Sequence, residues 1–98
     1  MDAIFAANDM MAIGAMDELR SRGIAVPSQV AVAGFDDVPI SRHLGLTTAR
    51  VRIDELGAHA VARLIDIIEG SGDEAVKRLL PPELIVRGSS IADAKQAP

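Results

Sequence analysis

The sequence predicts an α/β fold with a mainly parallel sheet. Short apolar or β-branched segments alternate with stretches of helical periodicity, and polar residues directly follow the first two apolar segments. Strands that alternate with helices are typical of βαβ units, whose strands run parallel and whose crossovers are right-handed. Ligands of such sheets bind beyond the carboxyl ends of the strands, where these polar residues lie.

The first strand and helix occupy residues 3–23. Residues 3–7, AIFAA, are apolar without alternation, which predicts a strand buried on both faces. A helix over residues 8–23 follows, with Asn8 or Asp9 as its N-cap and Gly23 just beyond its end. Its predicted apolar face consists of Ala12, Ala15, Met16 and Leu19.

Three further extended segments are predicted. Residues 30–35, VAVAGF, indicate a second buried strand, and Pro39 starts a short helical turn after it. Residues 47–53 alternate and are rich in β-branched side chains, which favours an extended segment. Residues 83–87, ELIVR, indicate a last strand, at an edge or kink because two prolines precede it.

The strongest helical pattern covers residues 54–70. Asp54 is its predicted cap, Glu55 suits the positive end of the helix dipole, and Gly70 ends it. A polar loop follows. One apolar stripe, called the helix-54 stripe below, consists of Leu56, Ala60, Val61, Leu64, Ile65 and Ile68.

Composition excludes several classes of function. The 98 residues amount to one domain at most, and 49% apolar residues are enough for a core. A net charge of −4 without a basic cluster argues against direct nucleic-acid contact. The absence of cysteine excludes disulfides and thiolate metal sites. We expect no metal and no cofactor.

Targeting signals are also missing from the sequence. No apolar run approaches the roughly 20 residues of a membrane-spanning helix. Asp2 follows Met1 directly, so the start lacks the basic region of a signal peptide. The cytoplasm is therefore the expected location, with no membrane partner.

Two polar pairs carry the main functional signal. Asn8 and Asp9 follow the first predicted strand, and Asp36 and Asp37 follow the second. If the strands are parallel neighbours, both pairs face one crevice. Three explanations compete: a helix cap or Asx-turn, a metal or phosphate site, and a clamp for the hydroxyls of a polar ligand. Of the first pair, one residue is expected to be the cap and the other to be free.

Other constellations are weaker. His43 and His59 lack metal-ligand spacing and are expected at the surface or at a partner. No G-x-S-x-G nucleophile motif occurs, and no enzyme activity is expected. The methionine cluster, Met10, Met11 and Met16, is expected in the core, with part of it available for an oligomer face.

Four motifs in order carry a family resemblance. They are A-N-D-x-x-A-x-G, G-[FY]-D-D, L-T-T and L-P-x-x-L-x-x-R. Over residues 2–90 the chain resembles the C-terminal part of the effector-binding domain of lactose-repressor (LacI/GalR) family transcription regulators. The resemblance implies a truncated C-terminal lobe of a periplasmic-binding-protein-like (type I) fold. It gives a partial effector-binding domain over residues 1–90 and a tail over residues 91–98.

The resemblance also implies a site and partners. Asn8 and Asp36 match effector-contact positions, commonly for sugar hydroxyls, and Phe35 lies beside that pocket. Asp9 and Asp37 are expected in structural roles, with Asp37 shaping the turn into Pro39. The implied partners are a small-molecule effector, a second copy in a homodimer, and operator DNA through a helix-turn-helix domain that the 98 residues do not contain. Candidate dimer-interface residues are Met10, Ile13, Met16, Asp17, His43 and Leu44.

Two departures from the family pattern matter. HLGLTT is shorter than the usual T-P-P-L-T-T, and there is no Trp or Tyr to stack on a sugar. The effector therefore stays open. In the family fold the 54–70 helix packs on the N-terminal lobe, so we expect the helix-54 stripe to be hidden by repacking, dimerisation or swapping.

Three functions are weighed. The leading hypothesis is a ligand-sensing and dimerisation part of a LacI-family regulator, binding effector weakly or not at all with half a cleft. The second is the corresponding lobe of a periplasmic sugar-binding protein. The third is a phosphoacceptor receiver domain or magnesium-dependent phosphotransferase built on Asp9, Asp36 and Asp37, which lacks a lysine at a fitting strand end.

Overall fold

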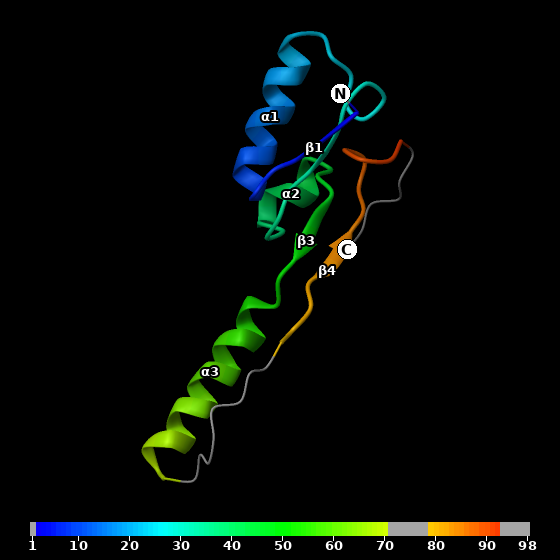
Figure 1. Cartoon of the computed structure of the whole chain (residues 1–98). Helices are drawn as coiled ribbons and strands as arrows, with labels where there is room; N and C mark the ends of the chain where they lie inside the picture. The colour runs from blue at the N-terminus through cyan, green and yellow to red at the C-terminus, as the bar shows by residue number, and fades with distance from the viewer. Residues whose placement is uncertain (1, 71–78, 93–98) are drawn as a thin grey trace. The chain divides into compact units, whose positions relative to one another are not determined.

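The computed structural model describes residues 2–70 and 79–92. The chain divides into two compact units, Met1–Val51 with Glu83–Pro98, and Arg52–Pro82. Figure 1 traces both units along the chain. Most of the loop predicted after Gly70 and most of the predicted tail lie outside the described residues.

The first unit is built on a parallel pair of strands. β1 (Ala3–Phe5) pairs with β2 (Ala31–Ala33), with Ile4 opposite Val32. The prediction that β1 is buried on both faces is wrong, since Phe5 is 72% exposed. Within the described chain β1 packs chiefly against β2, and its central residue Ile4 is half buried while Ala3 and Phe5 are exposed.

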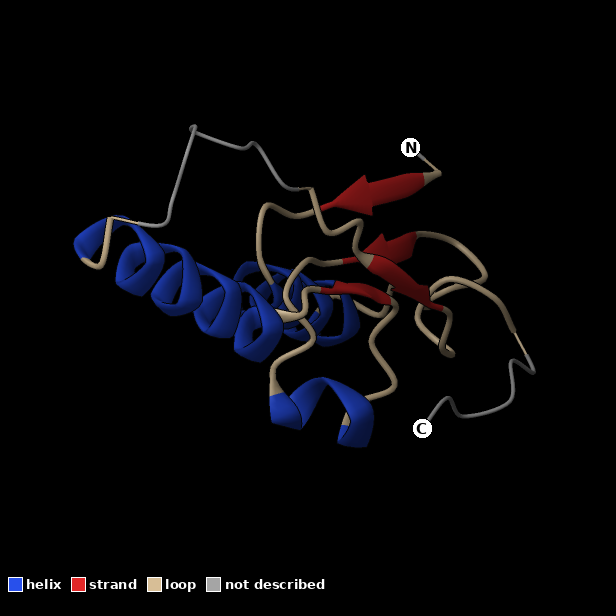
Figure 2. Cartoon of the chain, turned by 90° about the horizontal axis from the view of Figure 1, so that it is seen from below, coloured by secondary structure: helices blue, strands red, loops and turns tan. Residues whose placement is uncertain are grey.

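The parallel arrangement continues beyond β2. The Gly34 N–H donates to the Thr47 carbonyl at 2.9 Å, and a parallel bridge joins Ala33 to Thr47. The next strand, β3 (Thr48–Arg50), pairs antiparallel with β4 (Glu83–Ile85). Figure 2 shows these short strands, which are far apart in the sequence, lying beside one another. The predicted parallel pairing is thus present between β1 and β2, and isolated parallel bridges link this pair to the antiparallel pair of β3 and β4.

Helix α1 (Asp9–Ser21) covers the sheet. Asn8 is its N-cap, and Gly23 follows its end with a φ of +74° that favours glycine. Its apolar face packs against Val32 of β2 and against Leu46 in one core cluster. The fully buried members of this cluster are Ala12, Met16, Val32 and Leu46.

A short helix, α2, follows the second strand. It spans Pro39–His43, with Pro39 in its first turn as predicted. Ser41 is its buried residue, while Ile40 is half exposed. The turn after β2 therefore brings one buried hydroxyl back against the sheet.

The second unit contains α3 (Ile53–Ile68). Asp54 is not its cap, because the helix begins one residue earlier and Arg52 holds the cap position without a side-chain bond. No residue of α3 is buried, and the helix-54 stripe is exposed from Leu56 at 40% to Ile68 at 74%. The described chain therefore does not hide the stripe by repacking. None of the helices among the described residues is long and apolar enough to cross a membrane.

Candidate effector-binding site

The loop after β2 has an unusual backbone. Asp36 has a φ of +111° and Asp37 a φ of +56°, and both lie where side-chain-bearing residues are uncommon. The Asp36 N–H donates to the Ala49 carbonyl at 2.9 Å. The Asp37 N–H donates to Thr48 Oγ1 at 3.2 Å. β3 therefore holds the main chain of both acids.

Asp37 lies between two arginines. Arg50 Nε donates to Oδ2 and Arg87 Nη1 to Oδ1, each at 2.8 Å. Burial raises the pKa of the Asp37 carboxyl, but the hydrogen bonds and positive charges of Arg87 and Arg50 outweigh burial and leave this pKa below its ordinary value of 3.8. Both carboxylate oxygens are thus occupied by the protein, which fits the structural role expected for Asp37.

The carboxylate of Asp36 is placed differently. Its residue is half buried, and the side chain forms no hydrogen bond or ion pair with any residue that the structure describes. The two neighbouring acids therefore have different surroundings: Asp37 is paired with two cations, whereas the Asp36 carboxylate has no partner among the described residues.

Asp9 is fully buried and holds three segments together. Its Oδ2 accepts from the Val38 N–H at 3.0 Å and from Ser41 Oγ at 2.5 Å, and its Oδ1 accepts from Thr48 Oγ1 at 2.6 Å. A side chain at Gly34 would collide with the Asp9 carboxylate, which explains the glycine there. The expectation that the residue of the pair that does not cap the helix is free is wrong, because buried donors surround Asp9.

Asn8 and Phe35 complete the loop edge. Asn8 Oδ1 accepts from the Met11 N–H at 2.9 Å, so this oxygen caps α1. The Asn8 amide nitrogen donates no hydrogen bond within the described residues. Phe35 is half buried, and its carbonyl accepts from the Asp9 N–H at 3.0 Å. This bond joins the loops after β1 and β2, so the two polar pairs lie at the same edge, as expected for parallel neighbours.

The candidate interface residues separate into two groups. Met10, Asp17, His43 and Leu44 are exposed, and Ile13 is half buried against the core. Met16 does not belong with them, because it is 2% exposed and packs inside the core cluster. The apolar face of α1 repeats at three and four residues, and Met16 belongs to this face, which packs on the core.

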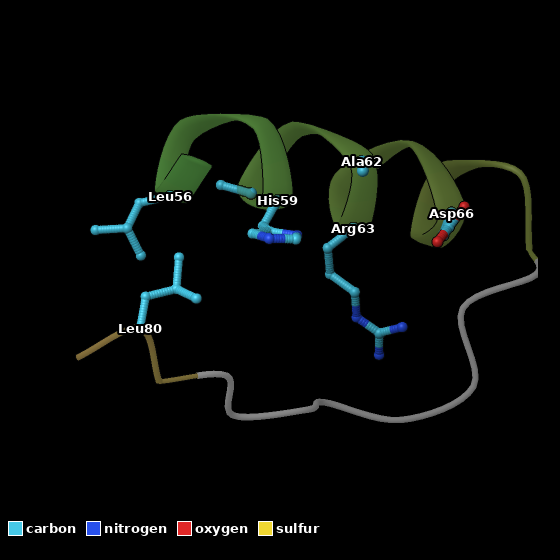
Figure 3. Close-up of a pocket in the computed structure, with 7 residues that line it drawn as sticks. Leu56, His59, Ala62, Arg63, Asp66 and Leu80 are labelled. Atoms are coloured by element: carbon cyan, nitrogen blue, oxygen red, sulfur yellow. The ribbon is translucent and has the colours of Figure 1, made fainter. Parts of the chain in front are cut away.

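Two grooves lie elsewhere. One of about 530 Å³ belongs to the second unit, where Leu56 and Leu80 face each other and His59 and Arg63 point to the same side (Figure 3). A smaller one of about 300 Å³ is lined by α2, Asp37 and Arg87. Neither contains Asn8, Phe35 or Asp36, so we do not assign the effector to them.

Sequence reasoning missed the partners of Asp9 and Asp37. Arg87 is 1% exposed and reaches Asp37 from the strand end after β4. Arg87 is the last residue of the L-P-x-x-L-x-x-R motif. A cation at the end of an apolar segment was the one available sign that it has a buried partner. Ser41 and Thr48 carried no comparable signal. The described residues contain no group of three His, Cys, Asp or Glu side chains placed to hold one metal ion.

Comparison with known proteins places the chain in a family. The sequence profile of the periplasmic binding protein-like domain matches residues 1–90. The chain belongs to this family. The transcriptional regulator AscG of Escherichia coli K12 is 40% identical over 95 residues, covering 95% of this chain and 28% of AscG.

Solved structures of this family agree in fold. CelR in complex with cellobiose gives a TM-score of 0.86 at 36% identity, over 92% of this chain and 28% of that chain. The lac repressor dimer bound to operator and the anti-inducer ONPF gives 0.83 at 33% identity, over 93% and 32%. These relatives are LacI-family regulators, so the resemblance and the predicted fold are confirmed. The chain spans about a third of them or less.

Proposed function

We propose that this chain is the ligand-sensing and dimerisation part of a LacI-family transcription regulator. The observation that carries the proposal is the Asp36 carboxylate, which has no partner among the described residues and lies in a loop whose backbone is bonded to β3. Asn8 and Phe35 lie at the same edge, within a chain that matches regulators over most of its length.

The chemistry of this edge fits a polyol. A carboxylate with two free oxygens accepts hydrogen bonds from neighbouring hydroxyls, each contributing roughly 1.5–3 kcal/mol. The Asn8 amide adds a donor, and Phe35 adds an apolar edge. A sugar offers pairs of neighbouring hydroxyls to such a carboxylate. One relative of known structure is a cellobiose complex.

Sensing would act by linkage and not by catalysis. An effector that prefers one arrangement of the lobes shifts the equilibrium between them, and DNA affinity changes with it. Operator contact would come from a helix-turn-helix domain beyond these 98 residues, since the net charge of −4 does not favour phosphate contact. Such a regulator would work in the cytoplasm and would not be an enzyme.

The homodimer is part of the same proposal. Met10, Asp17, His43 and Leu44 are exposed on α1 and at the end of α2, and Ile13 borders them. A relative of known structure is a dimer on operator DNA. The lobe of a periplasmic sugar-binding protein is the weaker alternative, since the reported relatives are regulators. A helix-turn-helix upstream in the native gene would support the regulator, and a signal peptide would support the alternative.

An NMR titration of the isotope-labelled chain with a sugar panel that includes cellobiose tests the site. We expect weak binding, at millimolar concentrations, with amide shifts concentrated at Asn8, Phe35 and Asp36. Asp36→Asn should remove these shifts, while Asp17→Asn on the exposed side of α1 should keep them. Micromolar affinity would contradict the half-cleft, and shifts that avoid all three residues would contradict the site.

A further inference from the structure

The structure assigns to Arg87, with Arg50, the role of holding Asp36 in a strained backbone conformation through Asp37. The functional value of this role rests on the effector site proposed above. The strain and its cause are properties of the chain itself, so they can be measured without any ligand.

The strain lies at Asp36. Its φ of +111° is well beyond the left-handed helical minimum near +57°, which Asp37 occupies at +56°. Two consecutive side-chain-bearing residues at positive φ are costly, and glycine would adopt both conformations without strain. Such a conformation persists only where the surrounding structure fixes it.

The network around Asp37 supplies that fixation. Arg87 donates to Asp37 and also to the Leu46 carbonyl at 2.9 Å, while its main-chain N–H donates to Thr47 Oγ1 at 2.8 Å. Arg50 holds the other oxygen of Asp37. The residue next to Asp36 is therefore anchored by two cations that are themselves anchored to β3 and to the strand end after β4.

The same network contains a second unfavourable feature, a buried donor. Arg87 Nε is buried and has no hydrogen-bond partner within the described chain, although buried donors are nearly always paired. The guanidinium is thus oriented so that Nη1 donates to Asp37 and to the Leu46 carbonyl, while Nε has no partner within the described chain. One role of the network, presenting the Asp36 carboxylate, would account for both the strain at Asp36 and the Arg87 Nε that lacks a partner among the described residues.

The first measurement separates strain from the loss of the carboxylate. Asp36→Gly and Asp36→Ala both remove the carboxylate, but only glycine also removes the Cβ that makes the positive φ unfavourable. We expect Asp36→Gly to melt about 4 °C above Asp36→Ala in thermal unfolding, the shift that one strained residue gives in a domain of this size. Equal melting temperatures for the two variants would overturn the inference.

The second measurement tests the arginines. Arg50→Gln removes one cation from a half-buried position, so the fold should survive. Arg87→Lys keeps a charge but loses the planar guanidinium that aims Nη1 at both Asp37 and the Leu46 carbonyl. We expect the advantage of Gly over Ala at position 36 to fall by at least half in each background. The one-bond Cα–Hα coupling of Asp36, which reports the sign of φ, should shift in both variants.

Glu83→Gln is the matched control. Glu83 approaches Arg50 Nη1 at 4.0 Å but does not touch Asp37. This variant should leave the Gly advantage and the Asp36 coupling unchanged. An undiminished advantage and an unchanged coupling in Arg50→Gln and Arg87→Lys would overturn the role of the arginines. Because no sugar is used, failure of the proposed effector site would leave these results intact, and the reverse also holds.

Discussion

Asp9 is the clearest residue-scale test of the fold. Its carboxylate accepts from one fixed donor, the Val38 N–H, and from two hydroxyls that can rotate. Asp9→Asn places an amide donor where acceptors are needed and removes a buried charge with matched partners. We expect a loss of about 2–3 kcal/mol in the free energy of unfolding, measured with urea.

The control for this prediction lies on the same helix. Asp17 is exposed on α1, and Asp17→Asn should change the free energy of unfolding by no more than about 0.5 kcal/mol. If the Asp9 and Asp17 variants lost the same small amount, the three hydrogen bonds would not contribute to stability as described.

Asp37 gives a prediction of pH dependence. Its pKa is lowered in the folded protein, so its ion pairs contribute stability that is present above the ordinary value of 3.8 and is lost as the pH falls through the lower, folded value. An NMR titration of the Asp37 carboxyl carbon in the folded chain should give a midpoint below 3.8. A midpoint at or above 3.8 would contradict the arginine network.

Single residues were predictable where the signal is local. The Asn8 cap, the turn begun by Pro39 and the glycines that end both long helices follow from neighbours in the sequence. The burial of Asp9 and the pairing of Asp37 with Arg87 depend on residues up to 50 positions away, and no local pattern encodes such contacts. The opposite surroundings of the two acids after β2 therefore emerge only in the folded chain.

At the scale of elements, α3 has apolar side chains that the described chain does not cover. Its stripe is exposed along the whole helix. Burying such side chains is worth roughly 1.5–3 kcal/mol each, so an uncovered stripe favours association. We expect the isolated chain to self-associate through it, visible as concentration-dependent sedimentation in analytical ultracentrifugation.

Two variants of α3 make this test specific. Leu64→Glu puts a charge in the helix-54 stripe and should shift the sedimentation toward monomer. Ala62→Glu puts the same charge on the same helix but outside the helix-54 stripe, and it should not shift the sedimentation. A compact monomer of the unmodified chain at all concentrations would sink the prediction.

The elements that were wrongly predicted share a cause. The apolar pattern of β1 correctly predicted a strand but not its burial, because burial requires neighbours that the described chain does not supply. The start of α3 was misplaced at Asp54 because a good capping residue was available, although Ile53 already belongs to the helix. Periodicity thus gave the existence and type of elements, while their surroundings gave their boundaries and exposure.

At the scale of the whole molecule, the chain is a fraction of the relatives that it matches. It covers 28% of AscG, so the edge formed by Asn8, Phe35 and Asp36 would be one wall of the effector site proposed above. Affinity for a ligand depends on enclosure as well as on single hydrogen bonds. This is why weak effector binding is expected even if each contact is correctly placed.

The two units should also differ in local stability. α1 packs against the core cluster through Ala12 and Met16, whereas α3 has no buried residue. Local opening costs least where few apolar contacts must be broken. Native-state hydrogen exchange on dilute chain should therefore show α3 amides exchanging much faster than those of α1. Equal protection of the α1 and α3 amides would mean that α3 is covered in solution. If dilution and Leu64→Glu both left the α3 protection unchanged, the chain itself would cover the helix, and a second copy would not.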